Sequence, residues 1–220
     1  MRNAFQDEIE MEERREKLLE TGFRLFSRSS IESVKLTEIA EESGIGIATL
    51  YRYFENKSTL VIEIGIKVWR GYFEEVHRMY DEMNGDDMSG EEELSFFLDC
   101  FIDLYRNHKD ILRFNRNFDT YVKHSRCTAE QMRPFNDAMG IFAQKFHTVI
   151  SKSQNDGTLN ITEPEEKMFI NLLYIMLSVT EMYTDGLVYP VIEQRDMTAE
   201  LFELKEMIMK NYKSTHGTGK

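Results

Sequence analysis

Apolar side chains recur at intervals of three and four residues along most of the chain, which is the period of an α-helix. Leu19, Phe23 and Phe26 follow this spacing near the N-terminus, and the apolar positions of residues 58–83 continue it. Three prolines and twelve glycines are few for 220 residues, so long uninterrupted helices are expected. The pattern predicts an all-α protein of about nine helices, at residues 7–27, 38–43, 47–54, 58–83, 91–107, 109–119, 128–154, 164–186 and 198–212.

The segment 91–107 is apolar nearly all round, with its polar residues in one narrow stripe. A helix of this kind is expected at the centre of a bundle. Two hydroxyl residues stand where helices are expected to begin: Thr37 and Ser58 are predicted as N-caps. Gly44 is predicted to end the short helix that Thr37 opens.

Charge and composition limit the possible functions. The chain carries 27 basic and 39 acidic residues, a formal charge of -12. This balance argues against non-specific binding to nucleic acid or anionic membranes, but it leaves room for a local basic footprint. The N-terminus lacks the apolar region of a secretory signal, and no apolar run has the length of a membrane span, so a soluble cytoplasmic protein is expected.

Motifs of metal or catalytic chemistry are not found. The two cysteines, Cys100 and Cys127, lie far apart and are predicted to be buried thiols in a reducing compartment. The five histidines form no i, i+4 pair and no cluster with the cysteines, so no metal site and no cofactor is predicted. No Ser/His/Asp frame and no glycine-rich phosphate loop is present, so an enzyme is not expected.

The stretch "LTEIAEESGIGIATLYRYFENKSTL" begins at Leu36 and predicts two short helices joined by a glycine turn. It resembles the DNA-binding signature of the tetracycline-repressor (TetR) family: threonine, then Ile-Ala, a glycine turn, "TLYRYF" and a lysine shortly after. Two positions depart from the usual pattern. Gly46 stands where the family usually has serine, and Ile47 occupies a position that is often polar or basic.

The resemblance implies a helix-turn-helix whose second helix enters the major groove of double-stranded DNA. On this interpretation Thr37 faces a phosphate, Arg52 contacts guanine or phosphate, and Lys57 corresponds to the family's phosphate-contacting lysine. Each of these side chains taken singly also fits ordinary packing or a solvated surface. The predicted DNA-binding residues are Thr37, Gly46, Ile47, Ala48, Thr49, Tyr51, Arg52, Tyr53 and Lys57.

The same resemblance implies the organisation of the whole chain. Residues 1–57 would form the helix-turn-helix domain, residues 58–213 a helical domain for ligand binding and dimerisation, and residues 214–220 a disordered tail. A homodimer is implied, paired through the last two long helices, and the broad apolar stripes of residues 164–186 and 198–212 independently suit such an interface. The predicted interface residues are Phe169, Leu172, Leu173, Met176, Leu201, Leu204 and Ile208.

A pocket for a small-molecule effector of unknown identity is also implied. Its candidate lining is aromatic and rich in methionine, although such stripes also pack ordinary bundles. Glu181 and Asp185 form an i, i+4 acidic pair that would suit a cationic ligand. The predicted lining residues are Phe114, Phe118, Tyr121, Met139, Phe142, Phe146, Tyr174, Glu181 and Tyr183.

Two hypotheses of function follow. The first is a dimeric repressor that a small-molecule ligand releases from a near-palindromic operator. The second is a DNA-binding regulator or architectural protein of the same fold that a protein partner controls, with no small-molecule inducer. A second domain packed solid with methionine and phenylalanine would favour the second hypothesis.

Overall fold

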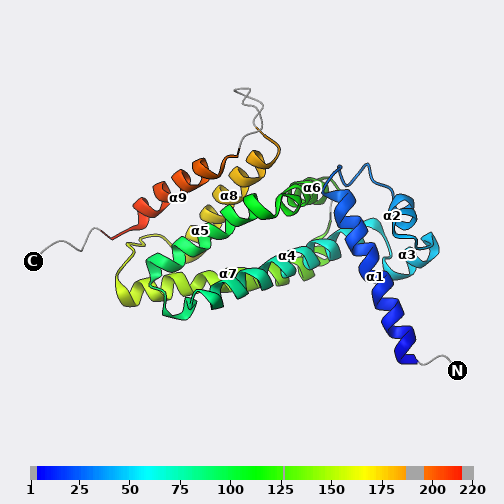
Figure 1. Ribbon diagram of the computed structural model, residues 1–220, viewed down its shortest axis with the longest axis horizontal. Coiled ribbons are helices and arrows are strands. Elements are labelled where there is room, and N and C mark those ends of the chain that lie inside the picture. The colour runs from blue at the N-terminus through cyan, green and yellow to red at the C-terminus, as the bar shows by residue number, and fades with distance from the viewer. Residues whose placement is uncertain (1–3, 126, 187–195, 215–220) are drawn as a thin grey trace, which may run out of the picture. The chain divides into compact units, whose positions relative to one another are not determined.

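The secondary structure is helical in the ranges that the computed structural model describes, residues 4–125, 127–186 and 196–214 (Figure 1). The elements are α1 (Ala4–Phe26), α2 (Leu36–Ser43), α3 (Ile47–Tyr53), α4 (Lys57–Glu82), the 3-10 turn η1 (Gly85–Asp87), α5 (Gly90–Asn107), α6 (Lys109–Ser125), α7 (Ala129–Asp156), α8 (Glu165–Thr184) and α9 (Thr198–Tyr212). One isolated antiparallel bridge joins Leu159 and Lys213. The prediction of an all-α fold is confirmed. No helix in the described ranges has both the length and the apolar character needed to cross a membrane.

The chain divides into two compact units. The first unit is Met1–Arg70 with Arg113–Asp137, and the second is Gly71–Leu112 with Ala138–Lys220. Helices α4, α6 and α7 each contribute residues to both. The domain boundaries derived from the sequence stay a prediction, and the predicted tail lies outside the described residues except for Ser214.

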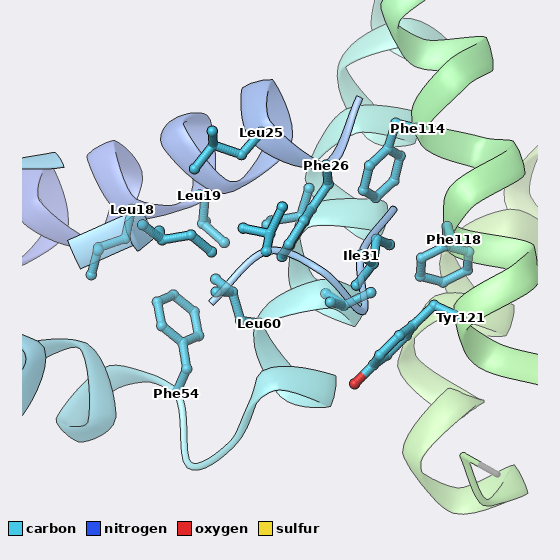
Figure 2. Packing of buried hydrophobic residues seen from close by; sticks show 14 of the residues in the cluster. Leu18, Leu19, Leu25, Phe26, Ile31, Phe54, Leu60, Phe114, Phe118 and Tyr121 are labelled. Carbon is cyan, nitrogen blue, oxygen red and sulfur yellow. The ribbon is translucent and has the colours of Figure 1, made fainter. Parts of the chain in front are cut away.

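A single apolar core holds the first unit together, and α1, α3, α4 and α6 all contribute to it (Figure 2). Phe26, Leu50, Phe54 and Leu60 are fully buried there. Gly22 permits a close approach, because a Cβ atom at this position would lie 2.6 Å from Cδ1 of Ile64 on α4. Packing of this kind fixes the long α1 and the short α2 and α3 on the first half of α4.

Helix α5 is the central helix of the second unit and packs against both α8 and α9. It begins with a capping box, in which Ser89 accepts from the amide of Glu92 and the Glu92 carboxylate accepts from the amide of Ser89. Its apolar side chains are buried, and its polar stripe also finds partners. Asp99, for example, accepts from Nζ of the buried Lys205 on α9 at 2.6 Å. The burial of α5 agrees with the central position predicted from its nearly uniform apolar surface.

The first residues of two helices differ from the sequence prediction. α2 begins at Leu36, with Lys35 in the N-cap position and no side-chain cap, so Thr37 lies in the first turn and is not the cap. α4 begins at Lys57, and Asn56 caps it by accepting from the amide of Thr59 at 3.0 Å. The hydroxyl of Ser58 lies instead 2.9 Å from that of Tyr121. Both N-cap predictions were wrong by two residues.

Candidate nucleic-acid interface

A left-handed glycine ends α2 and turns the chain into α3. Gly44 has a φ of 67°, and its amide donates to the carbonyl of Glu41 at 3.0 Å. The amide of Ile45 donates to the carbonyl of Ala40 at 2.9 Å. These two bonds make a Schellman motif, which satisfies carbonyls at the end of α2. The predicted C-terminal role of Gly44 is confirmed.

Helix α3 has one face in the core and one face in solvent. Leu50 is fully buried, as is Phe54 just after the helix. Ala48, Tyr51 and Arg52 are exposed, and Ile47 and Thr49 are half-buried. Gly46 precedes the helix in an extended conformation, where a Cβ atom would meet nothing within 4 Å. Ala48, Tyr51 and Arg52, three of the predicted DNA-binding residues, therefore lie on the solvent face of a short helix whose other face is anchored in the core.

The two tyrosines of α3 differ in how they present their hydroxyls. Tyr51 is 54% exposed. The hydroxyl oxygen of Tyr53 is buried, with no hydrogen-bond partner among the described residues. The Tyr53 ring instead lies 5.4 Å from the guanidinium carbon of Arg52, within the range of a cation–π contact. In this arrangement the Tyr51 side chain is largely exposed, whereas the Tyr53 ring packs against the guanidinium of Arg52.

Lys57 serves as an internal link in this structure. Its Nζ donates to the backbone carbonyls of Val34 at 2.5 Å and Glu32 at 3.2 Å. Burial lowers the pKa of Lys57, and the neighbouring Glu32 and Glu38 partly oppose this effect. The ammonium group has three protons, so one remains for a phosphate after these two bonds. Lys57 thus ties the α1–α2 loop to the start of α4.

Two lysines that sequence reasoning overlooked lie close to the short helices. Lys35 occupies the N-cap position of α2, and Nζ of Lys17 lies 3.9 Å from the point that a Cβ atom of residue 44 would occupy. Both are exposed, and neither forms an ion pair within the described ranges. Arg24, by contrast, pairs with Glu42 on α2 at 2.6 Å. In the sequence, the position of Lys35 just before the predicted short helix is the signal that could have identified it.

The predicted ligand-lining residues are distributed over both units. Those of α6, Phe114, Phe118 and Tyr121, are buried in the core of the first unit. In the second unit, the rings of Phe142 and Phe146 each lie about 5 Å from that of Phe97, centroid to centroid, at 5.3 and 4.8 Å. Three further members are half-buried: Met139, Glu181 and Tyr183. The last member, Tyr174, is 62% exposed.

The predicted dimer-interface residues lie mostly inside one chain. Leu172, Met176, Leu201 and Ile208 are buried, and Phe169, Leu173 and Leu204 are half-buried. The apolar side chains that α8 and α9 expose are different ones from the same helices. They are Ile170, Tyr174, Ile175, Met182, Phe202 and Met207, between 40% and 69% exposed.

The fold and this surface define an all-α helix-turn-helix protein. Residues 18–64 match the sequence profile described as bacterial regulatory proteins, tetR family. An HTH-type transcriptional regulator of Staphylococcus aureus is 30% identical over 104 residues, which cover 46% of this chain and 52% of that relative. The chain thus spans about half the length of this curated relative. The helix-turn-helix segment of this chain is thus similar to that of bacterial regulatory proteins of the tetR family.

Solved structures share the fold over nearly the whole chain. The transcriptional regulator FadR from Bacillus subtilis, in complex with stearoyl-CoA, has a TM-score of 0.66 at 12% identity and covers 88% of this chain and 96% of its own. A protein from Saccharomonospora viridis in complex with choline has a TM-score of 0.69 at 18% identity and covers 92% and 99%. At such low identity these likenesses show the fold alone.

Proposed function

We propose that the protein is a dimeric DNA-binding transcriptional regulator that lays α3 in the major groove of double-stranded DNA. The observation that carries this proposal is the solvent face of α3, with Ala48, Tyr51 and Arg52 exposed above a fully buried Leu50. A small residue permits close approach of the helix, while the hydroxyl and the guanidinium contact phosphates and base edges. The family match at residues 18–64 supports the same role.

Selection of bound sequences from random DNA tests this proposal. We expect a near-palindrome whose half-sites lie about one helical turn, roughly 34–36 Å, apart. Arg52→Ala should weaken binding to that sequence by about tenfold or more, since a good bidentate base contact is worth about 1–3 kcal/mol. Arg78→Ala, which removes an exposed arginine from the second half of α4, is the matched control. Equal losses in the two variants would count against α3 as the reading helix.

We propose further that two copies pair through the exposed apolar side chains of α8 and α9. Two helices from each copy would form a four-helix contact, as the family resemblance implies. Tyr174 and Met207 are 62% and 69% exposed, so the rest of the chain leaves most of their apolar surface uncovered. Tyr174→Glu should shift the purified protein toward monomer in light scattering at micromolar concentration. Ile141→Glu, at an equally apolar and 51% exposed position on α7, should leave the dimer intact.

For control of DNA binding we propose release by a small-molecule ligand held in the second unit. Two proteins of the same fold were solved with a ligand, stearoyl-CoA in one and choline in the other. A ligand releases DNA only through a difference in its affinity for the bound and free conformations. The half-buried Glu181 would favour a cation in such a site.

The alternative is control by a protein partner without an inducer. The close contacts among the rings of Phe73, Phe97, Phe142 and Phe146, 4.8–5.3 Å between centroids, favour this version, since the rings fill the space between their helices. Titrating the protein–DNA complex with a metabolite set that contains quaternary amines and acyl thioesters separates the two. Release by one member supports the ligand; retention with every member supports the partner.

A further inference from the structure

Three side chains capable of binding a metal meet in the second unit, outside the surfaces described above. Glu75 lies on α4 and Asp103 on α5, and His108 is the C-cap residue directly after α5. One ligand atom from each lies within 4.8 Å of the other two. Nε2 of His108 is 3.4 Å from a carboxylate oxygen of Glu75 and 3.6 Å from Oδ2 of Asp103.

The imidazole of this group has one buried ring nitrogen. Nε2 of His108 is buried and has no hydrogen-bond partner among the described residues, although two carboxylates are close. Neither Glu75 nor Asp103 forms an ion pair with a lysine or arginine in the part of the chain that the structure describes. A buried polar atom without a partner is costly, and so are two adjacent carboxylates without a cation.

We propose that Glu75, Asp103 and His108 bind a divalent transition-metal ion of the zinc type. Zinc binds histidine nitrogen and carboxylate oxygen at about 2.0–2.2 Å, and tetrahedral ligands at that distance lie about 3.3 Å from one another. The observed separations of 3.4 and 3.6 Å need little change to reach this value. Imidazole selects zinc-type ions over magnesium or calcium, which prefer oxygen alone. The two carboxylates balance the double charge of the ion.

The surroundings of the site hold one of the ligands in place. Oδ1 of Asp103 accepts from Nδ2 of Asn107 at 2.7 Å, which leaves Oδ2 to the ion. The hydroxyl of Tyr72 donates to the carbonyl oxygen of Cys100 at 2.5 Å and lies 3.4 Å from Oδ2 of Asp103. Partners of this kind orient ligands and are typical of metal sites. All three ligands are only partly buried, so a water molecule can supply the fourth ligand.

The sequence did not reveal this group, because its members follow no short spacing. Asp103 and His108 are five residues apart, and Glu75 lies on another helix. Only the packing of α4 beside the end of α5 brings them together. Binding of an ion would tie these two helices and is independent of the surfaces on α3, α8 and α9.

Isothermal titration of Zn²⁺ into the full chain, freed of metal with a chelator, tests the proposal at pH 7.5, where an ordinary histidine is neutral. We expect one ion per chain and a rise in the midpoint of thermal unfolding. Glu75→Gln, Asp103→Asn and His108→Gln should each weaken binding by at least about tenfold, the least that loss of a supporting group costs. His147→Gln is the control, because His147 lies 2.9 Å from the single carboxylate of Glu165 on the surface.

Circular dichroism of each metal-free variant shows whether the variant is still folded. Glu75→Gln is the most informative variant, since it keeps the shape of a half-buried side chain and removes only its charge. Saturable binding that the three ligand variants weaken and the control keeps supports the site. Absence of binding at micromolar Zn²⁺, or equal binding by the three ligand variants and the parent, overturns it.

Discussion

The side-chain amide of Asn117 on α6 donates to the carbonyl oxygen of Phe26, the last residue of α1, at 2.8 Å. Its second proton goes to the carbonyl of Ser29 at 3.1 Å. Carbonyls at the end of a helix have no partner in the helix itself and need one from elsewhere. A residue of α6 thus supplies the partner and closes the loop that leads from α1 toward α2.

Removal of this amide should loosen the first unit. We expect Asn117→Ala to lower the free energy of unfolding by about 1–3 kcal/mol, because the carbonyls of Phe26 and Ser29 both lose their donor and the bond to Phe26 is partly buried. Urea unfolding followed by circular dichroism measures the change. Asn136→Ala, at an exposed position on α7, should change it by less than about 0.5 kcal/mol. Similar values for the two variants would show that the amide contributes little.

Two glycines should respond to alanine in opposite directions. Gly44 has a φ of 67°, which costs an L-residue about 1–2 kcal/mol, so Gly44→Ala should destabilise the protein by about that amount. Gly140 lies within α7, and a Cβ atom there meets nothing within 4 Å. Gly140→Ala should therefore stabilise by about 0.5–1 kcal/mol. Thermal or urea unfolding of both variants measures these changes. A neutral Gly44→Ala would show that residue 44 does not need the left-handed conformation.

A buried ion pair joins α5 to α7 in the second unit. Nζ of Lys152 lies 2.5 Å from the carboxylate of Glu93, which is 5% exposed, and also donates to the carbonyl of Gly85 at 2.7 Å. Burial lowers the pKa of Lys152, but its bonds to Glu93 and Tyr80 outweigh this and raise the pKa.

Breaking this pair should cost more than replacing it. We expect Lys152→Met to destabilise by about 3 kcal/mol or more, since it leaves the Glu93 carboxylate buried without a cation. The double variant Glu93→Leu/Lys152→Met should recover part of that loss in urea unfolding. A double variant less stable than Lys152→Met would contradict the expected coupling.

Asp156 should make stability depend on acid pH. Its carboxylate accepts from the amide of Gly90 at 2.7 Å and from the amide and hydroxyl of Thr158 at 2.9 and 2.7 Å. Burial tends to raise the pKa of Asp156, but these bonds lower it below the ordinary value. A lowered carboxyl pKa contributes stability above the unfolded value of about 3.9, and this is lost as the pH falls through the folded value.

The variant Asp156→Asn separates this effect from general acid unfolding. The stability difference between the parent and Asp156→Asn should be largest near pH 7 and should shrink below about pH 4. Urea midpoints measured between pH 3 and pH 7 give this difference directly. A difference that stays constant over that range would remove Asp156 as its source.

Helical periodicity predicted the helices well because burial of one face repeats over many residues. α9 begins and ends where the pattern of apolar residues predicted, and α5 is central as its uniform surface indicated. The N-caps at Thr37 and Ser58 were wrong because a cap depends on the backbone angles of one residue. Asn56 and Thr59 show that a competing side chain two residues earlier is enough to move the start of a helix.

The solvent face of α3 could be predicted because the family signature fixes its register, and Leu50 is buried as expected. Partners from distant parts of the chain could not be predicted. Phe114 and Phe118 belong to the core around α1 and α4, which no periodicity within α6 indicates. The group that contains Glu75 and His108 could not be predicted from the sequence for the same reason, since only tertiary packing brings its members together.

The salt dependence of binding to the selected DNA tests the DNA-reading surface most directly. Residues 46–60 carry Arg52 and Lys57 against Glu55, so recognition rests on placed groups more than on total charge. Arg52, Lys17 and Lys35 are exposed on each copy, so a dimer neutralises at most about six phosphates through them. At about 0.9 per neutralised phosphate, log affinity should fall by about two to five units per unit of log salt. A slope near ten, or no selected sequence at low salt, would contradict a reading surface built on α3.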